Sequence, residues 1–264
     1  MSIQRLTHIG RQVWRNALGV TGLRPSDVWL ASFPRSGNSW FRIILGNIIH
    51  ISEGREQEVD LHTLGELCPV MGYTNLLKPW EHEVIPRLLK THQPYRAPFF
   101  NRPTRTLLQF RDPRDVMLSW YNLRTNAKLI AYNDSFEHFV RDPKVGFEAW
   151  MRHYSSWLPH ATTVMPYEEL KASPLSTLQR CFGELGFTVP GDILQSAIEC
   201  STIEKVRKKE QEQGVRDAKR YKDTFRAVRN GASGDWKDRY GKAERAVYAE
   251  LHAHFGIDRY PPDP

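Results

Sequence analysis

The chain has 264 residues, with 37 lysines and arginines against 30 aspartates and glutamates. This length is sufficient for the core of one large domain, and no low-complexity linker or internal repeat divides the sequence. No segment approaches the roughly eighteen apolar residues of a membrane-spanning helix, so we expect no integral membrane segment. The net charge of +7 favours anionic partners, whether small phosphates, nucleic acid or a membrane surface.

The cysteines and the first 26 residues bear on location. Three cysteines, far apart and without a CxxC pair, argue against disulfides and a thiolate metal site, and favour a cytoplasmic protein. Residues 1–26 contain four arginines and no acid, which is typical of a transit peptide or a membrane-surface helix. Because Trp14 and Leu18 widen its apolar face, we instead predict a helical extension packed on a single domain that spans residues 1–264.

Residues 27–33 (DVWLASF) predict a buried strand, and residues 38–50 carry apolar side chains at helical spacing. The stretch SFPRSGNSW places a glycine turn between them. A strand, a tight turn and a helix in this order point backbone N–H groups and the positive helix end at an anion. An ordinary strand-to-helix turn is the alternative.

Three further strands are predicted at residues 87–91, 104–110 and 161–165. Asp112 and Pro113 are typical of the cap and the first residue of a helix. Other helical patterns lie at residues 135–158, from residue 167, and at 195–209 and 242–255. Alternating strands and helices predict an α/β fold with a mainly parallel central sheet flanked by helices, and ligands bind such sheets at the carboxyl ends of the strands.

The loop at residues 34–39 has the donors for one phosphate. Consecutive N–H groups and short polar side chains come from Ser36, Gly37, Asn38 and Ser39, and Arg35 adds a charged fork. ATP and GTP loops use a lysine directly after the last glycine, whereas Asn38 stands there in this chain. A ligand with a single phosphate at this loop, without a metal ion, fits better.

Other candidate residues also follow predicted strands. Lys90 and His92 are two residues apart in an extended segment, so both point to one side, as a general base with an electrostatic helper would. Arg111 and Ser119 can face an anion along the following helix. The alternatives are a structural histidine, an Arg111 paired with Asp112 or Asp115, and a Ser119 packed in the core.

Residues 205–229 contain ten lysines and arginines against four acidic residues. Such a run is usually a solvated face. Gly231 and Gly234 follow it, however, and indicate a loop able to close on an anion.

Taken in order, these stretches resemble the sulfotransferases that use 3′-phosphoadenosine-5′-phosphosulfate (PAPS), of the cytosolic type and its bacterial relatives. The motifs are FPRSGNSW, LLKTHQPY, FRDPRDVMLSWYN, PYEEL and RNGASGDWK. The resemblance implies a P-loop NTPase-like fold. It also implies transfer of a sulfuryl group from PAPS to a hydroxyl of a small-molecule acceptor (a phenol, alcohol, lipid or glycoside), which leaves 3′-phosphoadenosine 5′-phosphate (PAP).

The resemblance implies a role for each candidate. The 5′-phosphosulfate would be bound by Arg35, Ser36, Gly37, Asn38 and Ser39. The adenine would contact Trp40, Tyr167 and, as a weaker match, Ser201. The 3′-phosphate would be bound by Arg111, Ser119, Arg229, Asn230 and Gly231. His92 would take the proton of the acceptor hydroxyl while Lys90 and Arg35 stabilise charge, without a metal ion.

The chain also departs from the family pattern. Arg35 stands where many cytosolic members have lysine, so a planar guanidinium with several N–H donors replaces a compact ammonium group. Asn230 replaces a cation often found beside Arg229. A family dimer motif would begin at Lys237 but is not matched after it, so the oligomeric state stays open.

Two other functions are compatible with the loop. A P-loop phosphotransferase or NTPase would need a carboxylate for Mg²⁺, for which Asp112 and Asp115 are the nearest candidates. A non-catalytic anion-binding protein would bind nucleic acid or acidic membranes through residues 205–229. If the chain is a sulfotransferase, we expect no nucleic acid partner.

The acceptor pocket is predicted at residues 60–86, 93–103 and 121–148. Its aromatic lining would consist of Trp80, Tyr95, Phe99, Phe100 and Tyr132. The alternative is that these aromatic side chains belong to the hydrophobic core.

Overall fold

A computed structural model describes residues 21–56, 59, 62–97, 100, 104–128, 131–214, 218–222, 231 and 233–263. Most of the predicted extension at 1–26, and the candidates Phe99, Arg229 and Asn230, lie outside the described residues.

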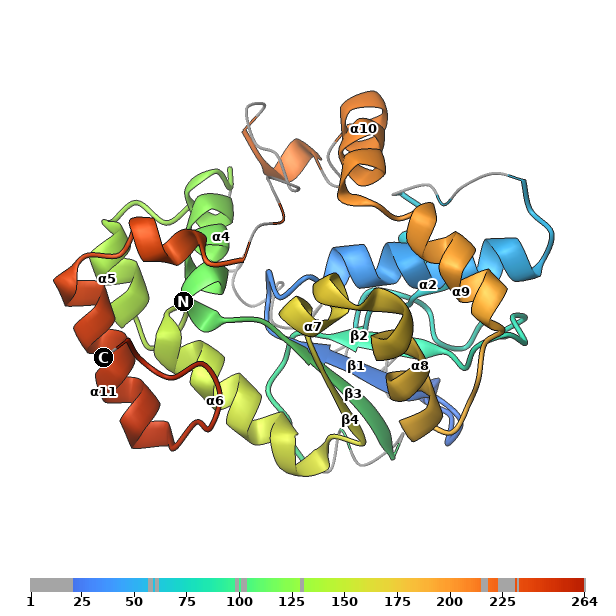
Figure 1. Cartoon of the computed structure of the whole chain (residues 1–264), viewed down its shortest axis with the longest axis horizontal. Helices are drawn as coiled ribbons and strands as arrows, with labels where there is room; N and C mark the ends of the chain where they lie inside the picture. Colours follow the sequence, from blue (N-terminus) through green and yellow to red (C-terminus); the bar gives the residue numbers. More distant parts are fainter. Residues whose placement is uncertain are drawn as a thin grey trace, which may run out of the picture.

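The described residues form a four-stranded parallel sheet in the order β2-β1-β3-β4 (Figure 1). The strands are β1 (Val28–Ser32), β2 (Leu88–Thr91), β3 (Arg105–Phe110) and β4 (Thr163–Pro166). The α/β prediction with a mainly parallel sheet is therefore confirmed. Each strand is a short, mostly buried run, as expected when helices cover both faces.

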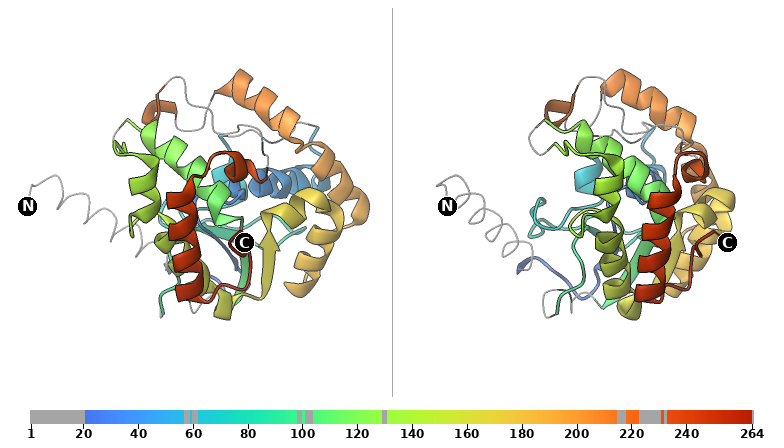
Figure 2. Two further views of the ribbon diagram at one scale, coloured as in Figure 1. Left: turned by 60° about the vertical axis from the view of Figure 1, so that its left-hand side comes forward. Right: turned by 90° about the vertical axis from the view of Figure 1, so that its left-hand side faces the viewer.

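Helices lie on both sides of this sheet, as Figures 1 and 2 show. Leu30 and Leu107 belong to a core shared with α2 (Asn38–Ser52), α8 (Pro174–Glu184) and α9 (Gly191–Glu199). Trp29 and Leu108 point to the opposite face, where the core includes α4 (Pro113–Thr125), α6 (Phe147–Trp157) and α11 (Lys242–Phe255). The remaining helices are α3 (Leu64–Leu67), α5 (Phe136–Arg141), α7 (Tyr167–Ala172) and α10 (Ile203–Gln213).

Two predicted helical segments are each divided. The pattern at 135–158 forms α5 and α6, because Pro143 and Gly146 lie between them. The pattern at 195–209 ends as α9 and restarts as α10, where the Thr202 side chain accepts a hydrogen bond from the Lys205 N–H as a new cap. The cap predicted at Asp112 is confirmed, since its carboxylate accepts from the Arg114 N–H.

A groove of about 410 Å³ lies at the amino ends of the strands and is lined by Arg24, Arg105 and Trp80, among others. Its arginines hold the chain together: Arg24 and Arg105 donate to the backbone carbonyls of Lys78, Leu185 and Ser26. Arg87 forms a buried ion pair with Asp27 at 2.7 Å. The lining of this groove is therefore explained by structural contacts.

None of the described helices is both long and apolar enough to cross a membrane.

Candidate active site

The candidate phosphate loop, predicted at residues 34–39, connects β1 to the first turn of α2 and contains a glycine that the geometry requires. Gly37 has a φ of +90°, and a Cβ at this position would lie 2.4 Å from Cδ2 of Tyr167. No side chain caps the N-terminus of α2, and its first turn has no acidic residue. The N–H groups of this 15-residue helix are therefore available to an anion.

Several polar atoms at this loop are buried without a hydrogen-bond partner. They are Ser36 Oγ, Asn38 Oδ1 and both amide atoms of Gln109 in the adjacent strand β3. Buried polar atoms are rarely left without partners in native proteins. Of these groups, the Ser36 hydroxyl and the Gln109 amide nitrogen can donate to a bound phosphate or phosphosulfate, or to the loop around it, whereas the two amide oxygens can only accept. Asn38 uses its amide nitrogen internally, donating to Ser32 Oγ at 3.0 Å, whereas Ser39 is exposed.

Arg35 lies in the left-handed region, with a φ of 70°, and its side chain reaches α4. Its Nε donates to Ser119 Oγ at 2.9 Å, although the two residues are 84 positions apart. Ser119 is 5% exposed. The structure therefore brings together two residues to which the resemblance gave different phosphates, and Ser119 is more than a core residue.

His92 lies just beyond β2, and its ring is fixed by the backbone of β1. Nδ1 lies 2.6 Å from the carbonyl oxygen of Ser32, which can only accept, so Nδ1 carries the proton and Nε2 is left as a proton acceptor. Surrounding protein atoms, and then the charge of Lys90, lower the pKa of His92 well below the usual range. His92 nevertheless keeps a solvent-accessible face. A neutral, accessible imidazole suits a general base.

A second histidine lies close by on α6. His153 is 2% exposed, its ring packs edge-on against Phe33 with centroids 5.9 Å apart, and its Nε2 lacks a hydrogen-bond partner. Burial lowers the pKa of His153 from 6.5 to about 3. Folding therefore keeps this ring neutral between about pH 3 and pH 6.5.

The neutral His153 predicts a loss of stability in acid. Between about pH 3 and pH 6.5 the unfolded chain binds a proton at this histidine and the folded chain does not. The free energy of unfolding therefore has its full value above pH 6.5 and falls as the pH drops below 6.5. Relative to a His153→Leu variant, the wild-type free energy of unfolding is expected to fall by about 2 kcal/mol more between pH 7 and pH 5. Urea unfolding of both proteins at several pH values measures this difference; parallel curves would contradict it.

Tyr167, the first residue of α7, connects the other parts of the site. The Arg111 guanidinium lies over its ring at 4.7 Å, and the Trp40 ring meets it edge-on at 5.8 Å. Its hydroxyl donates to the Gly231 carbonyl at 2.9 Å. Trp40 Nε1 in turn donates to the Ser201 carbonyl at 2.7 Å. Candidates from three distant parts of the sequence, Arg111, Trp40 and Gly231, thus adjoin Tyr167, and Ser201 joins them through Trp40.

The hydroxyl of Ser201 is occupied within the protein. Ser201 is fully buried, and its hydroxyl donates to the Ala197 carbonyl while accepting from Asn47. Any contact of Ser201 with a ligand would therefore use other atoms than this hydroxyl.

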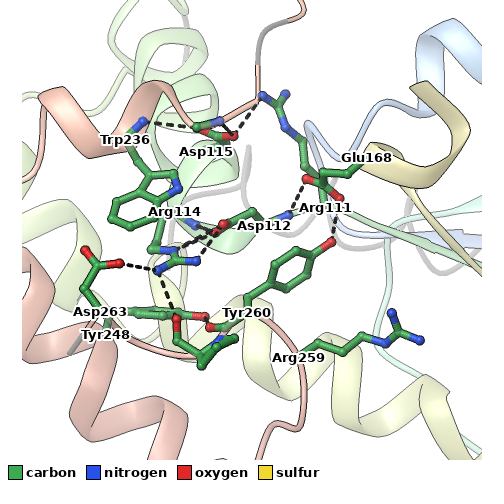
Figure 3. A network of polar contacts seen from close by, with 12 residues as sticks. Arg111, Asp112, Arg114, Asp115, Glu168, Trp236, Tyr248, Arg259, Tyr260 and Asp263 are labelled. Atoms are coloured by element: carbon green, nitrogen blue, oxygen red, sulfur yellow. Dashed lines mark hydrogen bonds and ion pairs between the residues drawn. The ribbon is translucent and has the colours of Figure 1, made fainter. Parts of the chain in front are cut away.

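A polar network attaches the C-terminal segment to this region (Figure 3). Asp115 lies 3.5 Å from Arg111 and accepts from the backbone N–H groups of Gly234 and Trp236. Glu168 accepts from the N–H of Asp112 and from the hydroxyl of Tyr260. The segment from Gly231 onward is therefore held beside the start of α4, next to Arg111.

Asp112 and Asp115 both have structural partners. Asp112 caps α4 and forms an ion pair with Arg114 at 2.8 Å. Asp115 binds the C-terminal segment described above. The pairing of Arg111 with Asp115, given above as an alternative, is thus observed, and both carboxylates are engaged in structural contacts.

Two of the aromatic residues predicted to line an acceptor pocket, Trp80 and Phe100, lie elsewhere. Trp80 lines the groove at the amino ends of the strands, whereas His92 follows the carboxyl end of β2. Phe100 is 3% exposed and packs on Trp29 and Trp157, and Tyr95 packs on Phe100. Phe100 therefore belongs to the core, as in the alternative given above, and Tyr95 packs against that core half-buried. The pocket itself stays a prediction.

Sequence reasoning missed Gln109 and His153. Gln109 is the only polar residue between Leu107 and Arg111, a signal that was present in the apolar run LLQF. His153 lies in an aromatic helix and gave no local signal.

The fold is that of an α/β protein. At the carboxyl ends of the neighbouring strands β1 and β2 lie the uncapped N-terminus of α2 and the neutral His92. The family model "Sulfotransferase domain" matches residues 25–251, so the chain belongs to this family. It is 27% identical to mouse Sulfotransferase 4A1 over 190 residues, which is 67% of this chain and 66% of that relative. It is 26% identical to human Sulfotransferase 2A1 over 245 residues, or 87% and 84% of the two chains.

Solved structures share the fold. Retinol dehydratase in complex with androsterone and PAP has a TM-score of 0.70 at 18% identity, covering 95% of this chain and 88% of that one. Mouse sulfotransferase SULT7A1 in complex with PAP has a TM-score of 0.64 at 16% identity, covering 94% and 91%. At these identities the similarity establishes the fold alone.

Proposed function

We propose that this chain is a PAPS-dependent sulfotransferase that transfers a sulfuryl group to the hydroxyl of a small-molecule acceptor. The observation that carries the proposal is the neutral His92, with a free Nε2, beside the phosphate loop. PAPS supplies the sulfuryl group, and PAP is released. His92 Nε2 takes the hydroxyl proton as the acceptor oxygen bonds to sulfur and the bond to the 5′-phosphate oxygen breaks.

The residues of the loop and its surroundings have separate parts in this proposal. The loop N–H groups and the start of α2 bind the 5′-phosphosulfate, and Lys90 and Arg35 stabilise charge on the transferring group. Arg111 and Ser119, with Arg229, Asn230 and Gly231, bind the 3′-phosphate. Trp40, Tyr167 and Ser201 adjoin the adenine. Since these cations can neutralise the transferring group, we expect activity without an added metal ion.

We further propose a single cytoplasmic sulfotransferase domain without a nucleic acid partner. A P-loop phosphotransferase is disfavoured because Asp112 and Asp115 are engaged in structural contacts. Retinol and androsterone, which are both alcohols, occur in complexes with the similar retinol dehydratase, so hydrophobic alcohols belong in an acceptor screen.

Calorimetry and turnover together test this function. We expect PAP to bind more tightly than Mg-ATP, and we expect PAPS to be turned over with at least one member of a panel of phenols, alcohols and sugars, with or without EDTA. A clear preference for Mg-ATP would refute the proposal and support a phosphotransferase. Binding of DNA or anionic vesicles without PAP binding would support the non-catalytic alternative.

A further inference from the structure

Gln109 lies beneath the phosphate loop. In the parallel register it is paired with Ser32 on one side and Met165 on the other. Its side chain is on the same face as Leu107 two residues earlier, which is the face covered by α2. Gln109 Nε2 lies 3.4 Å from the position that a Cβ on Gly37 would take. The amide is therefore next to Gly37, the residue directly before α2.

The Gln109 amide is fully buried, and neither its nitrogen nor its oxygen has a hydrogen-bond partner. Asn47, a buried amide in α2, shows the usual situation, since it donates to Ser201 Oγ and accepts from the Val59 N–H. A buried amide without partners is costly, because its bonds to water are lost and not replaced. Methionine has a similar length and would fill this position without that cost.

A second group without a partner lies on the residue before Gly37. Ser36 is also fully buried, and its hydroxyl lacks a hydrogen bond. The Ser36 N–H donates to the Phe33 carbonyl at 3.3 Å, so the N–H groups of Gly37 and of the first turn of α2 are the ones that would hold the anion. The groups that lack partners thus lie on the loop and directly beside it, where binding of an anion fixes the backbone.

We propose that Gln109 is a positioning residue of the phosphate loop. With a phosphate or phosphosulfate bound, its amide nitrogen donates a hydrogen bond to the Ser36 hydroxyl and thereby holds the N–H groups of Gly37 and of the first turn of α2 toward the anion. The anion-bound loop completes hydrogen bonds that the free protein lacks, so part of the affinity for the nucleotide comes from Gln109. This inference rests on the proposed function, because it concerns the same loop.

The variant Gln109→Met tests the inference. We expect it to bind PAP about tenfold more weakly and to raise the KM for PAPS by a similar factor at nearly unchanged kcat, because a ground-state contact of the loop is lost. Its melting temperature without ligand is expected to equal or exceed that of the wild type, because a buried amide without partners has been removed. The stabilisation by saturating PAP is expected to shrink.

Two further variants separate positioning from packing. Gln109→Glu keeps the shape but lacks the N–H donor and carries a carboxyl, so we expect it to bind PAP more weakly than Gln109→Met. Thr177→Val is a matched control, since Thr177 is buried and donates to the Glu169 carbonyl away from the loop. We expect this control to lower the melting temperature and to leave PAP affinity unchanged.

The outcomes are distinguishable. Wild-type affinity for PAP in Gln109→Met, or a fall in its ligand-free melting temperature with unchanged affinity, would refute the role of Gln109. If the wild type does not bind PAP, the proposed function fails, and a titration with inorganic pyrophosphate then tests the loop alone. Equal pyrophosphate affinity in the wild type and Gln109→Met would refute the inference in that case also.

Discussion

Replacement of His92 by alanine is expected to lower kcat by about a hundredfold to ten-thousandfold while PAP affinity stays within about twofold of wild type. The imidazole is fixed by the Ser32 carbonyl, which leaves Nε2 free to accept a proton. An alanine removes that acceptor but none of the loop donors. Steady-state turnover with the best acceptor and calorimetry with PAP measure the two effects separately.

The exposed His138 provides a matched control. It lies on α5, forms an ion pair with Asp134 and is remote from the phosphate loop in sequence. His138→Ala is expected to keep wild-type kcat. A His92→Ala variant that also keeps wild-type kcat on a good acceptor would exclude His92 as the base.

The pH profile gives a second measure of His92. Because its pKa is lowered, the imidazole stays in the neutral, proton-accepting form as the pH falls through the usual histidine range. We therefore expect kcat/KM to hold its plateau at pH 6.5 and to decline only at lower pH. A decline centred above pH 6.5 would assign the base to another group or show that bound PAPS raises the pKa.

The sheet was predictable from the sequence because each strand is a short apolar run that ends at a polar turn. The breaks between α5 and α6 and between α9 and α10 were not predicted, because the apolar periodicity of the sequence continues across them. There the decisive signals were local: Pro143 and Gly146 in one case, and the Thr202 cap in the other.

The site was predictable only as separate motifs. Phosphate loops and strand ends have local sequence signals, and their convergence follows from a parallel sheet. The contact of Arg35 with Ser119 and the central place of Tyr167 depend on tertiary packing, which no local pattern encodes. The prediction that Trp80 and Phe100 line the acceptor pocket was wrong because the same aromatic residue types occur in a hydrophobic core and in an apolar pocket.

In the proposed function, Arg111 binds the 3′-phosphate. It follows β3, lies over the Tyr167 ring at 4.7 Å and adjoins Asp115 at 3.5 Å. Asp115 is also bonded to the N–H groups of Gly234 and Trp236, so it holds the C-terminal segment independently of Arg111. Loss of Arg111 should therefore remove a charge without releasing that segment.

Arg111→Ala is expected to weaken PAP binding by about a hundredfold, because a charged donor to a phosphate is lost. Adenosine 5′-phosphate has no 3′-phosphate, so its affinity should be nearly unchanged in the same variant, and Arg111→Lys should fall between wild type and alanine for PAP alone. Arg152→Ala, at an exposed arginine paired with Glu148 on α6, is the control for net charge and should bind both nucleotides as the wild type does. An equal loss for both nucleotides in Arg111→Ala would mean that this residue supports the Tyr167 ring and the adenine rather than the 3′-phosphate.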